Sequence, residues 1–94
     1  MRSIKQTAAF KRDLKREAKG INRQAITEEL FPIACLLAAD KPLPAKYQDH
    51  ALTGKWKGYG ECHIRPDLLL VYAKIGKDIL HLTRLGSHSE IFGG

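Results

Sequence analysis

Hydrophobic residues recur every four positions near the start of the chain, and this spacing predicts a helix. Phe10, Leu14 and Ala18 form the apolar stripe, as in an amphipathic helix that packs one face on a core. The opposite face is basic and carries Lys11, Arg12, Lys15, Arg16 and Lys19. Thr7 is suited to cap the start of this helix, and Gly20 is suited to cap its end.

A second apolar stripe follows and predicts that another helix pairs with the first in a helical hairpin. This stripe consists of Ile26, Leu30, Ile33 and Leu37. Asn22 is its candidate N-cap. Pro32 lies inside the stripe, and a proline within a regular helix costs about 3 kcal/mol because it lacks an N–H and crowds the carbonyl four residues earlier. We therefore expect a kink or break between Glu28 and Pro32.

The pattern changes at residues 40–44, where prolines end the helical period because proline disfavours helix at the residue before it. The segment from there to Lys55 is expected to be a loop that carries His50. Between Trp56 and Ile64 the period becomes two, which predicts a strand. One face carries Trp56, Gly58, Gly60, Cys62 and Ile64, and the other carries Lys57, Tyr59, Glu61 and His63. We expect the first face to lie on the core.

Two further strands and a short tail complete the predicted sheet. Leu68 to Ala73 is an almost continuous apolar run, typical of a central strand buried on both faces. Gly76 marks a hairpin turn, and residues 79–85 form the last strand. Residues 86–94 are expected to be a loop or helical turn, and residues 2–6 a short first strand.

These elements predict one α+β domain spanning residues 1–94, in which an antiparallel meander of three strands packs against the helical hairpin and the N-terminal strand joins the sheet. The 94 residues, 44% of them hydrophobic, suffice for one core. Met1 is followed by polar residues, and no apolar run reaches the length of about 18 residues that indicates a membrane span. Cys35 and Cys62 lack a paired spacing, which favours reduced core thiols in a cytoplasmic protein.

Charge and histidine placement narrow the function. The chain has 16 Lys and Arg against 10 Asp and Glu, a net charge of +6 and a pI near 9.6, which indicates a polyanionic or acidic partner. Three of the four histidines lie in two polar windows, His50 and His63 within residues 48–67 and His88 within residues 84–92. Imidazole exchanges protons near neutrality because its unperturbed pKa is about 6.5. Several imidazoles in one site favour general acid-base chemistry.

The residues around these histidines fit a metal-independent ribonuclease. Such an enzyme needs a base for the ribose 2′-hydroxyl, an acid for the departing 5′-oxygen and positive charge beside the phosphate. The histidines can transfer the protons, and Arg84 can hold phosphate through two parallel hydrogen bonds. Asp67 can orient an imidazole and favour its charged form, and Phe92 can stack on a base.

Each candidate also has a purely structural interpretation. His50 and His63 could be surface histidines, and Asp67 could cap a turn. Arg84 could form a structural ion pair, and Phe92 could anchor the tail. Trp56 and His81 are assigned to structure. A metal site at the neighbouring Cys62 and His63 lacks further ligands at a suitable spacing. The alternative from another class is a basic module that binds RNA or a partner without catalysis, which the basic helix face serves equally well.

Four segments of the chain resemble the motifs of a known toxin family. They are DHALTGKWKGY at 49–59, ECHIRPD at 61–67, LLLVY at 68–72 and RLGSHSEIF at 84–92. On these motifs, and on the length and order of elements, the chain is similar to the YafQ branch of RelE-type bacterial toxins. The resemblance implies the two-layer fold described above. It also implies an active site formed by His50, His63, Asp67, Arg84, His88 and Phe92.

The resemblance further implies a function. Toxins of this branch cleave messenger RNA in the ribosomal decoding site and leave a 2′,3′-cyclic phosphate or its 3′-phosphate product. A cognate antitoxin silences them, and they meet operator DNA only through the antitoxin complex. We expect His50 and His63 to transfer the protons while His88 assists, without cofactor or metal, and Lys55, Lys57 and the basic helix face to bind RNA. Leu68 departs from relatives with an aromatic residue there, which bears on substrate preference.

Overall fold

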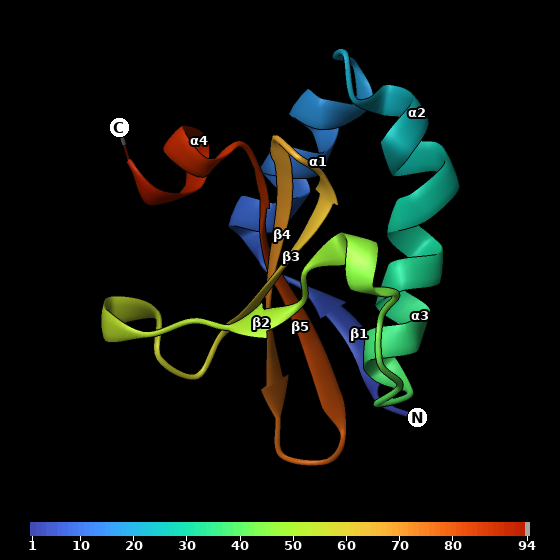
Figure 1. Cartoon of the computed structure of the whole chain (residues 1–94), viewed down its shortest axis with the longest axis vertical. Coiled ribbons are helices and arrows are strands. Elements are labelled where there is room, and N and C mark those ends of the chain that lie inside the picture. Colours follow the sequence, from blue (N-terminus) through green and yellow to red (C-terminus); the bar gives the residue numbers. More distant parts are fainter. Residues whose placement is uncertain (94) are drawn as a thin grey trace.

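The structure is a computed structural model and describes residues 1–93. Its strands are β1 (Ser3–Gln6), β2 (His50–Ala51), β3 (Gly60–Arg65), β4 (Leu68–Ile75) and β5 (Ile79–Gly86). Its helices are α1 (Ala8–Ala18), α2 (Arg23–Ala25), α3 (Phe31–Ala38) and α4 (His88–Phe92), with a π-helical turn η1 (Ile26–Leu30) and 3₁₀ turns η2 (Ala45–Tyr47) and η3 (Gly54–Trp56). Figure 1 shows α2 and α3 on one side of the sheet and α4 on the other.

The strands form one five-stranded sheet in the order β1-β5-β4-β3-β2. β3, β4 and β5 are the predicted antiparallel meander, and β1 joins it by pairing in parallel with β5. The predicted two-layer α+β fold is thereby confirmed. One expectation is wrong: His50 does not lie in a loop, because residues 50–51 form β2 and pair with β3.

Both predicted helices form, and the proline is accommodated without a break. Thr7 caps α1 as expected, its hydroxyl accepting the N–H of Phe10 at 2.9 Å. The C-cap of α1 is Lys19 rather than Gly20. In the second helix the wider turn η1 ends at Leu30, two residues before Pro32, and the backbone keeps helical angles into α3. A wider turn relieves the contact between a proline ring and the preceding turn, so the expected irregularity is a π-helical turn.

The main core lies between the sheet and the helical hairpin. Its fully buried members include Phe10, Ile33, Leu37, Leu68, Leu70, Leu80 and Leu85. The opposite face of β4 carries a smaller cluster of Leu69, Val71 and Ile91, packed with Leu52, Trp56, Tyr59 and Phe92. The central strand is therefore buried on both faces, as its apolar run predicted.

Trp56 differs from its expected position. It lies in η3, before β3 begins at Gly60, and packs in the smaller cluster rather than beside Cys62 in the main core. Gly60 itself is required by packing, because a Cβ there would stand 2.5 Å from the ring of Tyr72. Across residues 1–93, no helix has the length and apolar character needed to cross a membrane.

A β-bulge in β5 decides which way its last residues face. Val71 pairs with Arg84 while the next residue, Tyr72, pairs with Leu82, so Thr83 is the extra residue. Strict alternation from Leu82 would point Arg84 into the main core. The bulge instead brings Leu85 into the core and turns Arg84 to the opposite face, because one inserted residue reverses the alternation beyond it.

Candidate active site

A single row of paired residues crosses four strands on the sheet face opposite the helical hairpin. His50 of β2 pairs with Glu61 of β3, Glu61 with Val71 of β4, and Val71 with Arg84 of β5. Directly paired residues point to the same side of a sheet. Since neighbouring strands are about 4.8 Å apart, the row spans about 14 Å from His50 to Arg84. Two predicted site residues that are 34 positions apart in sequence thus share one face.

The adjacent row leads to the other histidines. His63 pairs with Leu69, and Leu69 pairs with Gly86 at the end of β5. α4 begins two residues later with His88 and is fixed by a capping box, in which the hydroxyl of Ser87 accepts the N–H of Glu90 at 3.2 Å and the carboxylate of Glu90 accepts the N–H of Ser87 at 2.8 Å. The strand end therefore delivers His88 to the rim of the same face.

His50 and His63 flank one buried carboxylate. Nε2 of His50 is 3.3 Å from Oε2 of Glu61, and Nε2 of His63 is 3.7 Å from Oε1. The two ring centroids are 6.1 Å apart. Glu61 is only 4% exposed, so it faces the two imidazoles with little water between them. The expectation that these two histidines lie together agrees with this geometry.

Sequence reasoning did not place Glu61 in the candidate site. The alternation along residues 56–64 placed it on the face of His63, which the structure bears out, but assigned it no part. A carboxylate two residues from a histidine on one strand face was the available signal. The contact with His50 could not be predicted, because it depends on β2, and no hydrophobic pattern in the sequence indicates that strand.

The ring of His50 is held from both sides. Its Nδ1 lies 2.7 Å from the carbonyl oxygen of Gln48, while its Nε2 faces Glu61. Both partners are acceptors, so a ring protonated on both nitrogens donates to both. Asp49, between Gln48 and His50 in the sequence, accepts a hydrogen bond from the hydroxyl of Tyr72 at 2.5 Å. This contact ties the start of β2 to the buried side of β4.

Arg84 is positioned by a buried carboxylate of α1. Nε of Arg84 donates to Oδ2 of Asp13 at 2.7 Å, and Nη2 donates to Oδ1 at 3.3 Å. Burial by itself raises the pKa of Asp13, but hydrogen bonds from Arg84 and from the Leu85 N–H, with the charges of Arg84 and Arg16, outweigh it and lower the pKa. Asp13 is therefore ionised near neutrality and holds a charged guanidinium at the site.

The rings of Phe92 and His88 pack against each other beside the two rows of paired residues. Their ring centroids are 4.9 Å apart, and the rings of Phe92 and Trp56 are nearly perpendicular with centroids 5.2 Å apart. Trp56 in turn packs against Tyr59 at 5.2 Å. Phe92 thus does anchor the tail to the sheet, and base stacking by its half-buried ring stays a prediction.

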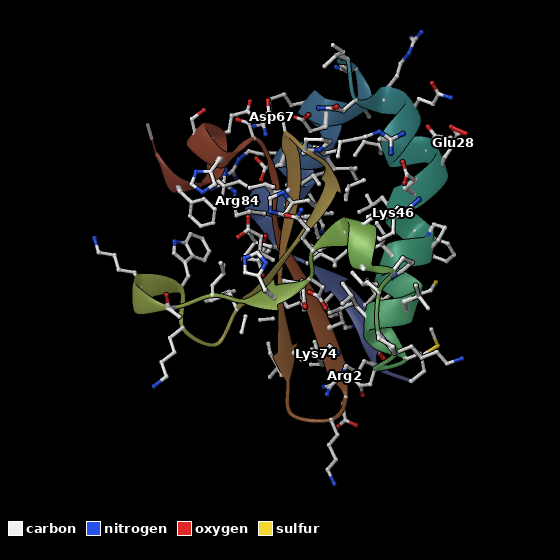
Figure 2. The ribbon with its side chains drawn as sticks, viewed as in Figure 1. Arg2, Glu28, Lys46, Asp67, Lys74 and Arg84 are labelled. Atoms are coloured by element: carbon white, nitrogen blue, oxygen red, sulfur yellow. The ribbon has the colours of Figure 1, made fainter. Side chains whose placement is uncertain are left out.

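Asp67 is not paired with an imidazole. It lies exposed in the turn between β3 and β4, at the upper end of the sheet in Figure 2, with Arg84 below it. Among residues 1–93 its carboxylate makes no side-chain hydrogen bond or ion pair, so its predicted role stays a prediction. Lys55 and Lys57 are exposed in and just after η3. His81 lies on the same face as Arg84, paired with Ala73 further along β5.

Two hollows adjoin the paired histidines. One of about 460 Å³ is lined by His63 with Tyr47, Gln48, Arg65 and Lys46. The other, of about 340 Å³, is lined by His50 with Tyr59, Tyr72 and Lys74. His50 and His63 therefore each border a hollow that also has a cationic side chain in its lining, Lys74 for His50 and Lys46 for His63.

The neighbouring Cys62 and His63, considered above as metal ligands, lie on opposite faces of the sheet. Within the described part of the chain, no three His, Cys, Asp or Glu side chains are arranged to hold an ion. Burial, assisted by the nearby carboxylates of Asp49 and Glu61, raises the pKa of Cys62 to about 12. Its thiol is a protonated core group on the helix side of the sheet, whereas His63 points to the other side. Cys62 and His63 therefore do not face a common site.

Comparison with known proteins agrees with this fold. The family model described as a bacterial toxin of type II toxin-antitoxin system, YafQ, matches residues 2–93. Over 92 residues the chain is 34% identical to the mRNA interferase toxin YafQ of Escherichia coli strain K12, covering 98% of this chain and 97% of that protein.

Solved structures give the same result. A metal-bound toxin from Helicobacter pylori is similar with a TM-score of 0.84 and 44% identity, covering 98% of this chain and 100% of that one. YafQ in the E. coli DinJ-YafQ toxin-antitoxin complex is similar with a TM-score of 0.81 and 36% identity, covering 98% of both chains. These matches define the class, a small bacterial toxin of the type II systems. Within it, the chain belongs to the YafQ family.

Proposed function

We propose that this toxin is an mRNA interferase, an endoribonuclease that cleaves messenger RNA without a metal ion. The E. coli relative is named for that activity. The observation that carries the proposal here is that Glu61 sits between the imidazoles of His50 and His63 while Arg84 lies on the same sheet face. This arrangement supplies two groups that can transfer protons and one fixed cation for phosphate.

The reaction follows from these groups. A base removes the proton of a ribose 2′-hydroxyl, whose oxygen attacks the adjacent phosphorus while the bond to the 5′-oxygen breaks. An acid gives that oxygen a proton, so the products are a 2′,3′-cyclic phosphate and a 5′-hydroxyl. Each proton transfer typically contributes about 10²- to 10⁴-fold in rate. Arg84 stabilises the charge that develops on the phosphate oxygens.

We assign the acid to His50 and the base to His63. Acceptors face both ring nitrogens of His50, so its doubly protonated form is the one that satisfies both contacts. His63 lies at 3.7 Å from Glu61, a longer contact, and borders a hollow in which a ribose has room. His88, exposed at the start of α4, assists in positioning, and Asp67 keeps its predicted role of orienting an imidazole and favouring its charged form.

Substrate is held by groups around the rows. Phe92 stacks on a base beside His88, a contact worth about 1–3 kcal/mol. Lys55 and Lys57 bind backbone phosphates from the η3 side. The basic face of α1 contacts ribosomal RNA while the messenger occupies the ribosome, because cationic side chains bind the phosphate backbone without regard to sequence.

A cognate antitoxin is the second partner. The E. coli relative has been solved as the DinJ-YafQ toxin-antitoxin complex, and a chain with a net charge of +6 suits an acidic or amphipathic segment that covers the site. Operator DNA is reached only through that complex. The free thiols of Cys35 and Cys62 suit a reducing cytoplasm.

The test is to express the wild type beside His63→Ala and, as a matched control, His81→Ala, which alters a histidine of the same sheet face outside the site. Wild type and the control should arrest growth and produce new transcript ends, and His63→Ala should do neither. Unchanged cleavage by His63→Ala rejects the assignment. Loss of cleavage by the purified toxin in EDTA rejects the metal-independent chemistry.

The exposed basic residues of α1 favour one alternative, a toxin that binds RNA without cutting it. Messenger RNA that stays intact on ribosomes while the wild-type protein is bound and translation stops would support this alternative instead.

A further inference from the structure

Asp13 is a buried carboxylate whose partners all belong to, or lead to, the candidate active site. It is 3% exposed, in the middle of α1. It accepts hydrogen bonds from Nε and Nη2 of Arg84, from the N–H of Leu85 at 3.0 Å and from Nη1 of Arg16 at 3.1 Å. A carboxylate removed from water is costly unless such donors surround it. Two of its donors come from consecutive residues at the end of β5.

The place of Asp13 in the fold explains this concentration. β1 pairs with β5 only as far as Leu82, and from there α1 meets the exposed strand edge. The hydroxyl of Thr7 donates to the carbonyl of Thr83 at 2.7 Å, Asp13 accepts the N–H of Leu85, and Arg16 donates to the carbonyl of Leu85 at 2.9 Å. Side chains of one helix thus fix the bulge that turns Arg84 outward.

The contact also sets the orientation of the guanidinium. Nε and Nη2 of Arg84 engage Asp13 side-on, and Nη2 reaches the carbonyl of Glu90 at 3.4 Å. Among residues 1–93, Nη1 has no hydrogen-bond partner, and the side chain is 25% exposed. A free arginine has several rotatable bonds to order before it can bind phosphate, whereas a held one does not, and Nη1 is the nitrogen left to donate. Figure 2 shows Arg84 beside α4, at the site face.

We propose that Asp13 is a positioning residue for Arg84, fixing its guanidinium so that the unpartnered edge meets the scissile phosphate. This inference rests on the phosphate-binding part proposed for Arg84 above. Asp13 touches no reacting atom and acts only through Arg84. A misplacement of about 1 Å at a catalytic site can cost on the order of 10²-fold in rate.

The chain offers a matched control in Glu17. It is also a buried carboxylate of α1, 8% exposed, and it also pairs with Arg16, at 2.9 Å, but it makes no contact with Arg84. Asp13→Asn keeps the side-chain size but replaces an acceptor oxygen by a donor amide, which faces N–H groups. Glu17→Gln makes the same chemical change one turn away.

The experiment measures single-turnover cleavage of one defined transcript on purified ribosomes. Thermal melts verify that every variant is folded at the assay temperature. Asp13→Asn should lower the maximal rate by on the order of 10²-fold, while the toxin concentration for half-maximal rate changes little. Glu17→Gln should cleave close to the wild-type rate. In an Arg84→Ala background, Asp13→Asn should cause no further loss.

Several results would overturn the proposal. They are wild-type cleavage by Asp13→Asn, equal losses in Asp13→Asn and Glu17→Gln, or an undiminished effect of Asp13→Asn without Arg84. Wild-type cleavage by Arg84→Ala would remove the phosphate-binding role itself, and absence of cleavage by the wild type would remove the proposed function. Failure of Asp13 alone has a different signature, a slow Arg84→Ala beside a normal Asp13→Asn.

A measurement on the unaltered protein covers the case in which Asp13→Asn does not fold. The ¹⁵N relaxation of arginine Nε–H groups reports how rigidly each guanidinium is held. Arg84 should be ordered like the backbone, while Arg12, exposed on α1, should be mobile. An Arg84 Nε as mobile as that of Arg12 contradicts the proposal.

Discussion

At the scale of single residues, the buried charge of Glu61 calls for an explanation. A carboxylate enclosed in a sheet costs free energy, and an apolar residue of similar volume is often at least as stabilising at such a position. The groups facing Glu61 are two imidazoles, one of them 48% exposed and the other 26% exposed. Partners so open to water repay little of that cost, which points to a role in proton transfer rather than in stability.

Replacing Glu61 by glutamine tests this role, because the amide keeps the shape and removes the charge. A hydrogen bond to a charged group is worth about 1.5–3 kcal/mol, which corresponds to a loss of about 10- to 100-fold in cleavage rate. The melting temperature should stay close to that of the wild type, since a buried charge is removed along with its contacts. Rates on a defined transcript and thermal melts check both expectations.

Glu28→Gln is the control for that experiment, since Glu28 is exposed on η1, away from the histidines. It should cleave like the wild type. A Glu61→Gln toxin that also cleaves at the wild-type rate would show that the imidazoles work without the carboxylate between them.

At the scale of elements, sequence pattern was sufficient where an element carries its own hydrophobic period. The helical hairpin and the meander of β3, β4 and β5 have such periods and were predicted. β2 has two exposed residues and no period, so His50 was expected in a loop. The parallel direction of β1 depends on its contact with β5, which local spacing does not encode.

The bulge at Thr83 shows the same limit at the site. Alternation from Leu80 and Leu82 points Arg84 into the core, and the reversal depends on donors and acceptors of α1, about 70 residues earlier in the chain. Motif resemblance supplied Arg84, His88 and Phe92 without any geometry. It did not supply Glu61 or Asp13, whose partners become evident only once strands and helices are placed together.

The short helix α4 is the element on which a site prediction can be tested by its cap. Ser87→Ala removes the hydroxyl that accepts the N–H of Glu90, a loss of about 0.5–2 kcal/mol. Because α4 carries His88 and Phe92, we expect a clear loss of cleavage with a small change in melting temperature. Amide hydrogen exchange should quicken at residues 88–92 and stay unchanged in β4. Equal quickening in both elements would mean that the cap stabilises the whole fold instead.

At the scale of the whole molecule, one ion network joins the two layers. Arg16 of α1 contacts Asp13 and Glu17 on its own helix and Glu90 of α4 at 3.2 Å, while Asp13 holds Arg84 of β5. Gly86 leaves room for the side chains of Arg16 and Glu90, because a Cβ there would lie 2.6 Å from Nη2 of Arg16. Helix α1, the last strand and the site helix are therefore coupled electrostatically as well as by packing.

This network predicts how the fold responds to acid. The pKa of Asp13 is lowered in the folded protein. That of Glu90 is also lowered, first by the hydrogen bond from the Ser87 N–H and then by the Ser87 side chain and the charge of Arg16, which together outweigh burial and the charge of Asp13. A depressed pKa means that the unfolded chain binds protons more readily, so the stabilisation is complete above the unfolded value of about 4 and is lost as pH falls through the folded value. The melting temperature should be level from pH 7 to about 5 and then fall. The melting temperature of Asp13→Asn should be lower than that of the wild type at pH 7 and should fall less on acidification. The control Asp78→Asn, at an exposed position, should follow the wild type. Parallel curves for wild type and Asp13→Asn would place the acid sensitivity in other carboxylates.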